Sequence, residues 1–344
     1  MKTKHMIAAF LTLIFSSSFA SASDINSDIE EFYSNNDIEM VIRATPGGGY
    51  DMYSRLLARH MGRHIPGNPN IIPINMPGGA GLTAANYMAN QAPQDGTVLS
   101  IISLSLPMYQ ALDLVDNLRA DMRELLWVGN MVDSPSVIVS WHTSAVRTLD
   151  DAIKQPLAIG ATAAGSISVQ LPNFLNNTLG TQFEIIRGYS GGNEINLAME
   201  QGEVDGRSSN PWSSYLSTQP RWVEERMINP LIQVGIRKGD EIPDVPLLME
   251  LATTEEQQQM FDFVSNAMAT ERPLATTPNV PPERLEVLRT AFERTLTDPE
   301  FLEDAARQQA EINLMTGQEL EDLIMRLFET PEELRNRIAE YFEG

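Results

Sequence analysis

Four short loops rich in glycine and other small residues could bind an anion. The two with most glycine are Gly47 to Gly49 and Gly78 to Gly81, and the others contain Gly165-Ser166 and Gly191-Gly192. Each loop follows a strand-like run and precedes a helical pattern. The first turn of a helix points free N–H groups and a positive dipole end at the loop, and glycine lets a ligand approach without a Cβ in the way. These loops favour a carboxylate, although each alone could be only a tight turn.

Histidines and serines offer little support for a metal site or for catalysis. His60 and His64 have the i, i+4 spacing of a metal pair, but no Glu follows His60 and the chain has no cysteine. We therefore expect no metal site and an exposed polar helix face at these two histidines. His142 is the only histidine of the second block of the chain, so a hydrolase with a nucleophile and a base in one cleft is the weaker alternative.

The elements that must position the loops repeat one order along the chain. Strand-like runs at 38–42, 71–75 and 98–103 alternate with helical patterns, which describes a βαβαβ unit with parallel strands and right-handed crossovers. A second block has the same order, with strands at 137–141, 157–160 and from 184, and helices at 169–179 and 194–201. We expect an α/β protein with a discontinuous first lobe, 24–133 plus 266–344, and a second lobe, 134–265. Loops from both lobes would then face one another across a cleft.

The two ends and the composition limit the compartment and the partners. Lys2 and Lys4, an apolar stretch and Ala20-Ser21-Ala22 predict a cleaved signal peptide over residues 1–22, and hence a periplasmic protein. The chain has no cysteine for a lipid anchor. Its net charge of −22 over 344 residues makes nucleic acids and anionic membrane surfaces improbable partners.

Several of these motifs occur in the order found in a known family. The run from Pro46 to Asp51, the run from Asn75 to Gly81 and the run from Ala92 to Thr97 resemble the substrate-binding proteins of tripartite tricarboxylate transporters, also called the Bug family. The resemblance continues through 160–166, 189–205 and 242–246. It therefore covers nearly all of the chain after the signal peptide.

The resemblance implies a monomeric periplasmic Venus flytrap that encloses a small organic carboxylate and needs no cofactor. Its partners would be a large and a small membrane permease subunit. The site residues carried over from the first lobe are Gly47, Gly48, Gly49, Gly78, Gly79, Ala80, Ser103 and Ser105. Those carried over from the second lobe are Ala163, Gly165, Ser166, Tyr189, Gly191 and Gly192. Tyr50 and Asp51 are expected to support the first loop.

The chain departs from the family pattern in the run Val204 to Ser209, where the last position lacks the usual acid. That removes support for an amino-acid ligand such as aspartate. Arg207 could bind a distal carboxylate, or it could be a surface arginine or part of an ion pair. Trp212 could cover the ligand, or it could be a core tryptophan.

The predicted function is therefore transport without catalysis. A ligand-sensing accessory of a membrane signalling system would have the same binding site, so this alternative stays open.

Overall fold

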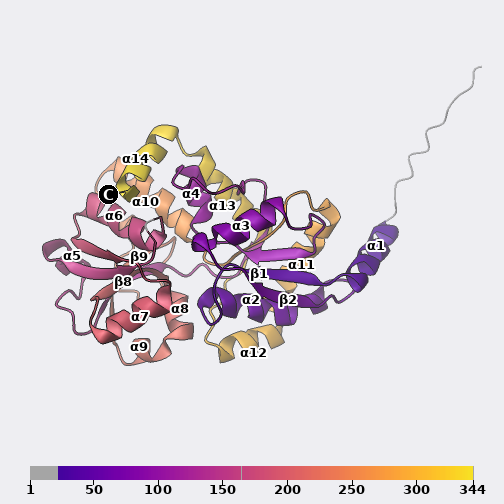
Figure 1. Cartoon of the computed structure of the whole chain (residues 1–344), viewed down its shortest axis with the longest axis horizontal. Helices are drawn as coiled ribbons and strands as arrows, with labels where there is room; N and C mark the ends of the chain where they lie inside the picture. The colour runs from indigo at the N-terminus through magenta and orange to yellow at the C-terminus, as the bar shows by residue number, and fades with distance from the viewer. Residues whose placement is uncertain (1–21, 164, 344) are drawn as a thin grey trace, which may run out of the picture.

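Two separate β-sheets organise the chain, and each forms the centre of an α/β lobe (Figure 1). The computed structural model describes residues 22–163 and 165–343. The predicted signal peptide over 1–22 lies outside this range except for Ala22, which begins helix α1 (Ala22–Asn35). No helix within the described residues is both long and apolar enough to cross a membrane.

The first lobe contains a six-stranded mixed sheet in the order β11-β4-β10-β3-β1-β2. Strands β1 (Ile38–Ile42), β2 (Ile71–Asn75) and β3 (Val98–Ile101) are parallel, which confirms the predicted βαβαβ unit. Strand β10 (Pro273–Thr276) runs antiparallel to both β3 and β4 (Leu126–Asn130). Strand β11 (Met315–Thr316) completes the sheet next to β4. The antiparallel strands bring distant parts of the chain into the first lobe.

Helices connect the three parallel strands and cover the sheet. Besides α1, the first lobe contains α2 (Gly49–His60), η1 (Met61–His64), η2 (Gly79–Gly81), α3 (Leu82–Asn90), α4 (Leu106–Ala111), α11 (Pro282–Thr297), α12 (Pro299–Arg307) and α13 (Gly317–Glu329). Helices α2 and α3 begin directly at the two glycine-rich loops, as the sequence predicted. The first turns of these helices therefore lie at the edge of the sheet where β1 and β2 end.

The second lobe contains a five-stranded mixed sheet in the order β7-β6-β8-β5-β9. Its strands are β5 (Ser136–Trp141), β6 (Leu157–Ala161), β7 (Phe183–Arg187), β8 (Gly206–Pro211) and β9 (Ile228–Val234). Strand β6 is parallel to β7 and β8, whereas β5 is antiparallel to β8 and β9. Its helices are α5 (Leu149–Lys154), α6 (Ile167–Leu179), α7 (Gly192–Gln201), α8 (Trp212–Thr218), α9 (Pro220–Glu224) and η3 (Leu248–Leu251).

Two helices depart from the expected division of the chain into lobes. The boundary between residues 265 and 266 falls inside α10 (Glu255–Met268), which contacts both α13 of the first lobe and β9 of the second. The last helix, α14 (Glu332–Glu343), packs against α6 of the second lobe (Figure 1). There the side chain of Asn173 donates to the carbonyl of Phe342 at 3.1 Å. The C-terminal helix therefore packs on the second lobe, whereas the sequence analysis assigned all of residues 266–344 to the first lobe.

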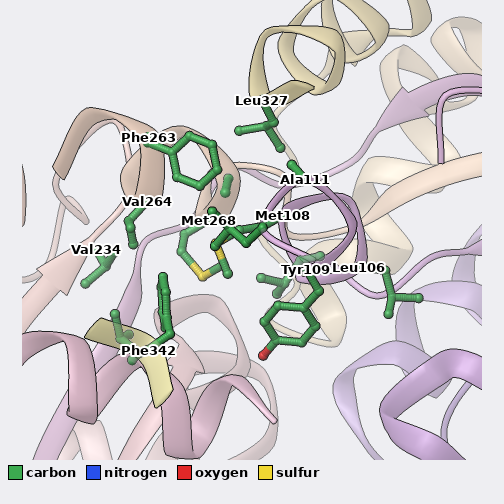
Figure 2. Packing of buried hydrophobic residues seen from close by; sticks show 14 of the residues in the cluster. Leu106, Met108, Tyr109, Ala111, Val234, Phe263, Val264, Met268, Leu327 and Phe342 are labelled. Atoms are coloured by element: carbon green, nitrogen blue, oxygen red, sulfur yellow. The ribbon is translucent and has the colours of Figure 1, made fainter. Parts of the chain in front are cut away.

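A single apolar cluster connects the two lobes. It includes side chains from α4 and α13 of the first lobe, from β9 of the second lobe, and from the two crossing helices α10 and α14 (Figure 2). The rings of Phe342 and Phe174 are stacked with centroids 5.1 Å apart, and both are fully buried. Because burial of apolar surface is the main stabilising contribution to folding, this cluster makes the stability of one lobe depend on the other.

Truncation of Phe342 tests this dependence. We expect Phe342→Ala to lower the free energy of unfolding by about 3–5 kcal/mol, because the change removes a buried ring and leaves a cavity. Urea unfolding followed by circular dichroism measures the change. Leu302→Ala is the control, since Leu302 is 40% exposed on α12 and its loss should cost no more than about 0.5 kcal/mol. Equal unfolding midpoints for Phe342→Ala and the wild type would show that α14 does not stabilise the molecule.

Candidate functional site

The first glycine loop is held in place by Asp51. Its carboxylate accepts the backbone N–H of Gly47 at 3.0 Å, and also accepts hydrogen bonds from Asn75 and Arg55, both at 2.9 Å. Burial opposes ionisation of Asp51, but these three hydrogen bonds outweigh it and hold the pKa of the carboxyl below its usual value. Asp51 therefore supports the loop, as predicted.

The second glycine loop turns through four residues with positive φ. Gly78, Gly79, Ala80 and Gly81 have φ of 143°, 53°, 56° and 108°. The carbonyl of Ala80 accepts a hydrogen bond from Nη2 of Arg43 at 2.8 Å. A Cβ at Gly81 would lie 2.6 Å from Nε of Arg43, so only glycine permits this close approach. Arg43 thus fixes the second loop against the end of β1.

The third first-lobe segment, Ser103 to Ser105, lies beside the other two. Ser103 and Ser105 are buried, and their hydroxyls are 3.4 Å apart. The backbone N–H of Leu104 donates to the hydroxyl of Tyr50 at 3.3 Å, which joins this segment to the first loop. A Cβ at Gly81 would lie 3.1 Å from Cβ of Ser103, which places the second loop next to it as well. The three first-lobe segments therefore meet at one edge of the sheet.

Two arginines that the sequence reasoning missed contact the ring of Tyr50 at this meeting point. The guanidinium carbon of Arg43 is 4.2 Å from the ring centroid of Tyr50, and that of Arg272 is 4.5 Å from the same centroid. Both distances are within the range of a cation–π interaction. The sequence offered one signal for Arg43, because it directly follows β1 and precedes the first glycine loop by a few residues. Arg272 gave no such signal, because it precedes a strand late in the chain.

Arg272 joins the two lobes through a buried polar cluster. It is 1% exposed and pairs with Glu271, which is fully buried, at 2.8 Å. Nη2 of Arg272 donates to the hydroxyl of Ser214, and the hydroxyl of Ser213 donates to Glu271, at 2.9 Å and 2.8 Å. Both serines belong to α8 of the second lobe. A Cβ at Gly49 would lie 2.6 Å from Nη2 of Arg272, so the first loop also contacts this cluster.

Burial raises the pKa of Glu271 to about 7, although Arg272 and the Ser213 hydroxyl act in the opposite direction. Desolvation disfavours the charged carboxylate, and here it exceeds the stabilisation from the adjacent cation.

In the second lobe, the small-residue loop after β6 carries a set of hydroxyls. Ser166 is buried, and its hydroxyl lies 2.8 Å from that of Thr162 and 2.7 Å from that of Ser168. Ala163 and Gly165 are exposed on either side of residue 164. These hydroxyls organise the loop directly before α6.

The loop from Tyr189 to Gly192 lies beside Arg207. The guanidinium of Arg207 would contact a Cβ at Gly192, and its Nη1 donates to the side chain of Asn196 at 2.7 Å. Burial lowers the pKa of Arg207. Within residues 22–163 and 165–343, no carboxylate pairs with Arg207, so the ion-pair alternative is excluded for that range. Gly192, the last residue of this loop and the first of α7, therefore lies against Arg207 near the start of β8.

Trp212 lies in the core of the second lobe. Its side chain is 2% exposed and packs in the apolar core of the second lobe with Tyr215 and Ile242. Its Nε1 donates to Glu241 at 3.0 Å. Trp212 therefore corresponds to the alternative reading as a core tryptophan.

Neither metal binding nor nucleophilic catalysis finds support among the described residues. His60 and His64 contact Asp304 and Asp298 of the α12 region at 2.9 and 2.8 Å, so they lie partly buried under that helix and not on an exposed face. Among the described residues, no group of three or more His, Cys, Asp or Glu side chains could hold a metal ion.

Ser190 lies in a Gly-x-Ser-x-Gly sequence, Gly188 to Gly192, which makes it the residue to examine as a nucleophile. Its hydroxyl donates to Glu194 at 2.5 Å, and Glu194 also accepts its backbone N–H at 2.8 Å. The serine therefore precedes α7 and bonds to Glu194 in its first turn, and it is not paired with a histidine in the described structure.

A family model described as the tripartite tricarboxylate transporter family receptor matches residues 54–336. No curated protein sequence gives a significant match.

Solved structures share the fold at low sequence identity. A TctC solute-binding protein from Polaromonas, without ligand, is 18% identical, with a TM-score of 0.63 over 89% of this chain and 99% of its own. An R. palustris protein with adipate is 19% identical, with a TM-score of 0.67 over 89% and 98%. MatC from Rhodopseudomonas palustris with bound malate is 17% identical, with a TM-score of 0.66 over 88% and 99%.

The buried carboxyl of Glu271 predicts a pH dependence of stability. Its pKa of about 7 in the folded state exceeds the ordinary value near 4.5, so the folded state binds more protons between these two pH values. The contribution of Glu271 is therefore fully present below about pH 4.5 and is lost as the pH rises to about 7. We expect Glu271→Gln to remove about 1–3 kcal/mol of the fall in unfolding free energy between pH 5 and pH 7.5.

Urea unfolding of both proteins at the two pH values measures this effect. The comparison uses the difference between the two pH values within each protein, so any uniform destabilisation by the substitution cancels. Identical pH differences in the wild type and the variant would contradict a protonated Glu271 in the folded state.

Proposed function

The chain belongs to the tripartite tricarboxylate transporter receptor family, and we propose that it captures a small organic carboxylate between its lobes for a membrane transporter. The family consists of periplasmic solute-binding proteins, and the two-lobed fold is that of binding proteins and not of enzymes. The proposal adds the ligand class, the residues that hold it and the delivery to permease subunits after removal of residues 1–22.

The observation that carries the proposal is the convergence of three first-lobe segments at the carboxyl ends of parallel strands. Ligands of open α/β sheets bind at this edge, because loops and helix N-termini present free N–H groups there. Gly47 is exposed, while Gly48 and Gly49 are partly exposed at the start of α2. Gly78, Gly79 and Ala80 are exposed at the start of α3. A carboxylate bound there would accept charge-assisted hydrogen bonds worth about 1.5–3 kcal/mol each.

Two structural neighbours support a carboxylate as the ligand class. One holds adipate and the other holds malate, and both share the fold over most of their length. Because their sequences are only 17–19% identical to this chain, they support the class of ligand but do not indicate which acid is bound.

A ligand screen tests the proposed class. We expect at least one organic acid from a panel of acetate, benzoate, succinate, malate, adipate and citrate to raise the melting temperature. A ligand that binds only the folded state stabilises it by RT ln(1 + [L]/Kd), which is about 2.7 kcal/mol at a hundredfold excess over Kd. Differential scanning fluorimetry of the protein without residues 1–22 measures the shift. Shifts with neutral sugars alone, and with none of the acids, would refute the proposal.

A substitution at Gly48 tests the first loop. A Cβ at Gly48 would meet no atom within 4 Å, and its φ of −91° suits any residue, so Gly48→Val should fold normally. The valine side chain would occupy the space of the ligand and separate it from the amides. We expect the Kd of the best acid to rise at least about tenfold, corresponding to the loss of one charge-assisted hydrogen bond. Isothermal titration calorimetry measures the Kd.

Ala145→Val is the control, because Ala145 is exposed in the loop before α5 and the variant also carries a valine side chain, at a position away from the glycine-rich loops. The melting temperature of each variant without ligand checks that the fold is retained. An unchanged Kd in a folded Gly48→Val protein would remove the first loop from the site.

A further inference from the structure

We propose that Arg43 binds the ligand carboxylate directly through its guanidinium and thereby selects for a charged acid over its neutral amide. This inference rests on the proposed function, because it concerns the same first-lobe site. It adds a side-chain cation to a site whose other donors are backbone amides and serine hydroxyls.

The position of Arg43 places it among all three first-lobe segments. It follows Ile42, the last residue of β1, and donates to Ala80 of the second loop. Its guanidinium lies over the ring of Tyr50, which follows the first loop and accepts the N–H of Leu104 in the third segment. Any ligand that contacts these three segments together therefore lies close to Arg43.

The charge of Arg43 has no counter-charge in the described structure. Its one hydrogen bond goes to a carbonyl, its aromatic contact is neutral, and no carboxylate within residues 22–163 and 165–343 forms an ion pair with it. Its buried Nε has no partner in that range. The chain has 46 acidic residues, and two other arginines of low exposure pair with them. Arg272 pairs with Glu271, and Arg289 pairs with Glu321 at 2.7 Å.

The lack of an acidic partner would not be sufficient by itself. Arg207 in the second lobe bonds only to the side chain of Asn196. Arg284 and Arg335 also contact only carbonyls and, for Arg284, an aromatic ring. Arg207 lies on β8 of the second lobe, and Arg284 and Arg335 lie on α11 and α14, so none of the three lies among the first-lobe loops. Arg43 combines a free charge with a position at the site.

The chemistry of the guanidinium suits a carboxylate. Arginine has five N–H donors in a planar fork, and Ala80 uses only one of those of Arg43. The stack on Tyr50 and the bond to Ala80 hold the side chain in place, so little side-chain entropy is lost when a ligand binds. A neutral amide in the same position would present an NH₂ group to a cation that offers only donors. Discrimination between acid and amide is therefore expected to depend on Arg43.

A cycle that combines a residue change with a ligand change tests the proposal. The ligands are the panel acid with the largest thermal shift and the same acid with one carboxyl replaced by a carboxamide. The proteins are the wild type, Arg43→Gln, Arg43→Lys and the control Arg147→Gln, since Arg147 is exposed in the loop before α5. Calorimetric Kd values are measured for each combination.

We expect the wild type and Arg147→Gln to bind the acid at least about tenfold more tightly than the amide, as for a hydrogen bond between charged groups. In Arg43→Gln this ratio should fall to about threefold or less, and Arg43→Lys should retain an intermediate ratio because it keeps the charge without the fork.

The alternative is that Arg43 only positions the second loop. Arg43→Gln would then weaken the binding of acid and amide by the same factor, and an unchanged acid-to-amide ratio would overturn the proposal while leaving the proposed function intact.

If the wild type binds no acid of the panel, the proposed function fails and this proposal fails with it. If Arg43→Gln does not fold, Arg43→Lys provides the test, and a ratio equal to that of the wild type would count against direct binding.

Discussion

The ring of Tyr50 lies within 4.5 Å of two guanidinium groups, and the arrangement of the candidate site depends on this contact. Arg43 uses the ring and the carbonyl of Ala80 to hold the first and second loops together. On the side of the lobe junction, Arg272 reaches Ser214 in the second lobe. Each cation–π contact contributes about 0.5–2 kcal/mol, more when it is shielded from water. The same aromatic ring therefore connects the first-lobe glycine-rich loops with the contact between lobes.

The junction between the lobes combines a costly polar contact with a stabilising apolar one. Burying Glu271 and Arg272 removes both groups from water, and their mutual attraction offsets only part of that desolvation. The apolar cluster that includes Phe174 and Phe342 lies between the same two lobes and supplies stability without directional bonds. Serine hydroxyls of α8 bond to both members of the polar pair, so these bonds form only when α8 of the second lobe lies against Glu271 and Arg272.

The sequence alone predicted the parallel strands and the loops well, for reasons that are local. Strand β1, the glycine run and α2 follow one another within about twenty residues, so hydrophobic periodicity and glycine placement determine them. The antiparallel strand β10 and the packing of α14 on α6 join segments far apart in the chain, and no local pattern encodes such contacts. Trp212 was open to two readings because its burial depends on Ile242 and Tyr215, which tertiary structure brings to it. Arg272 was missed for the same reason, since its partners Ser214 and Tyr50 lie on other elements.

A crystal structure of the protein with its tightest organic acid tests the central claim most directly. The account predicts a ligand carboxylate within hydrogen-bond distance of amides from both the Gly47 to Gly49 loop and the Gly78 to Ala80 loop, and of the guanidinium of Arg43. A ligand that contacts neither loop, or one bound at the two loops with Arg43 turned away from its carboxylate, would contradict it.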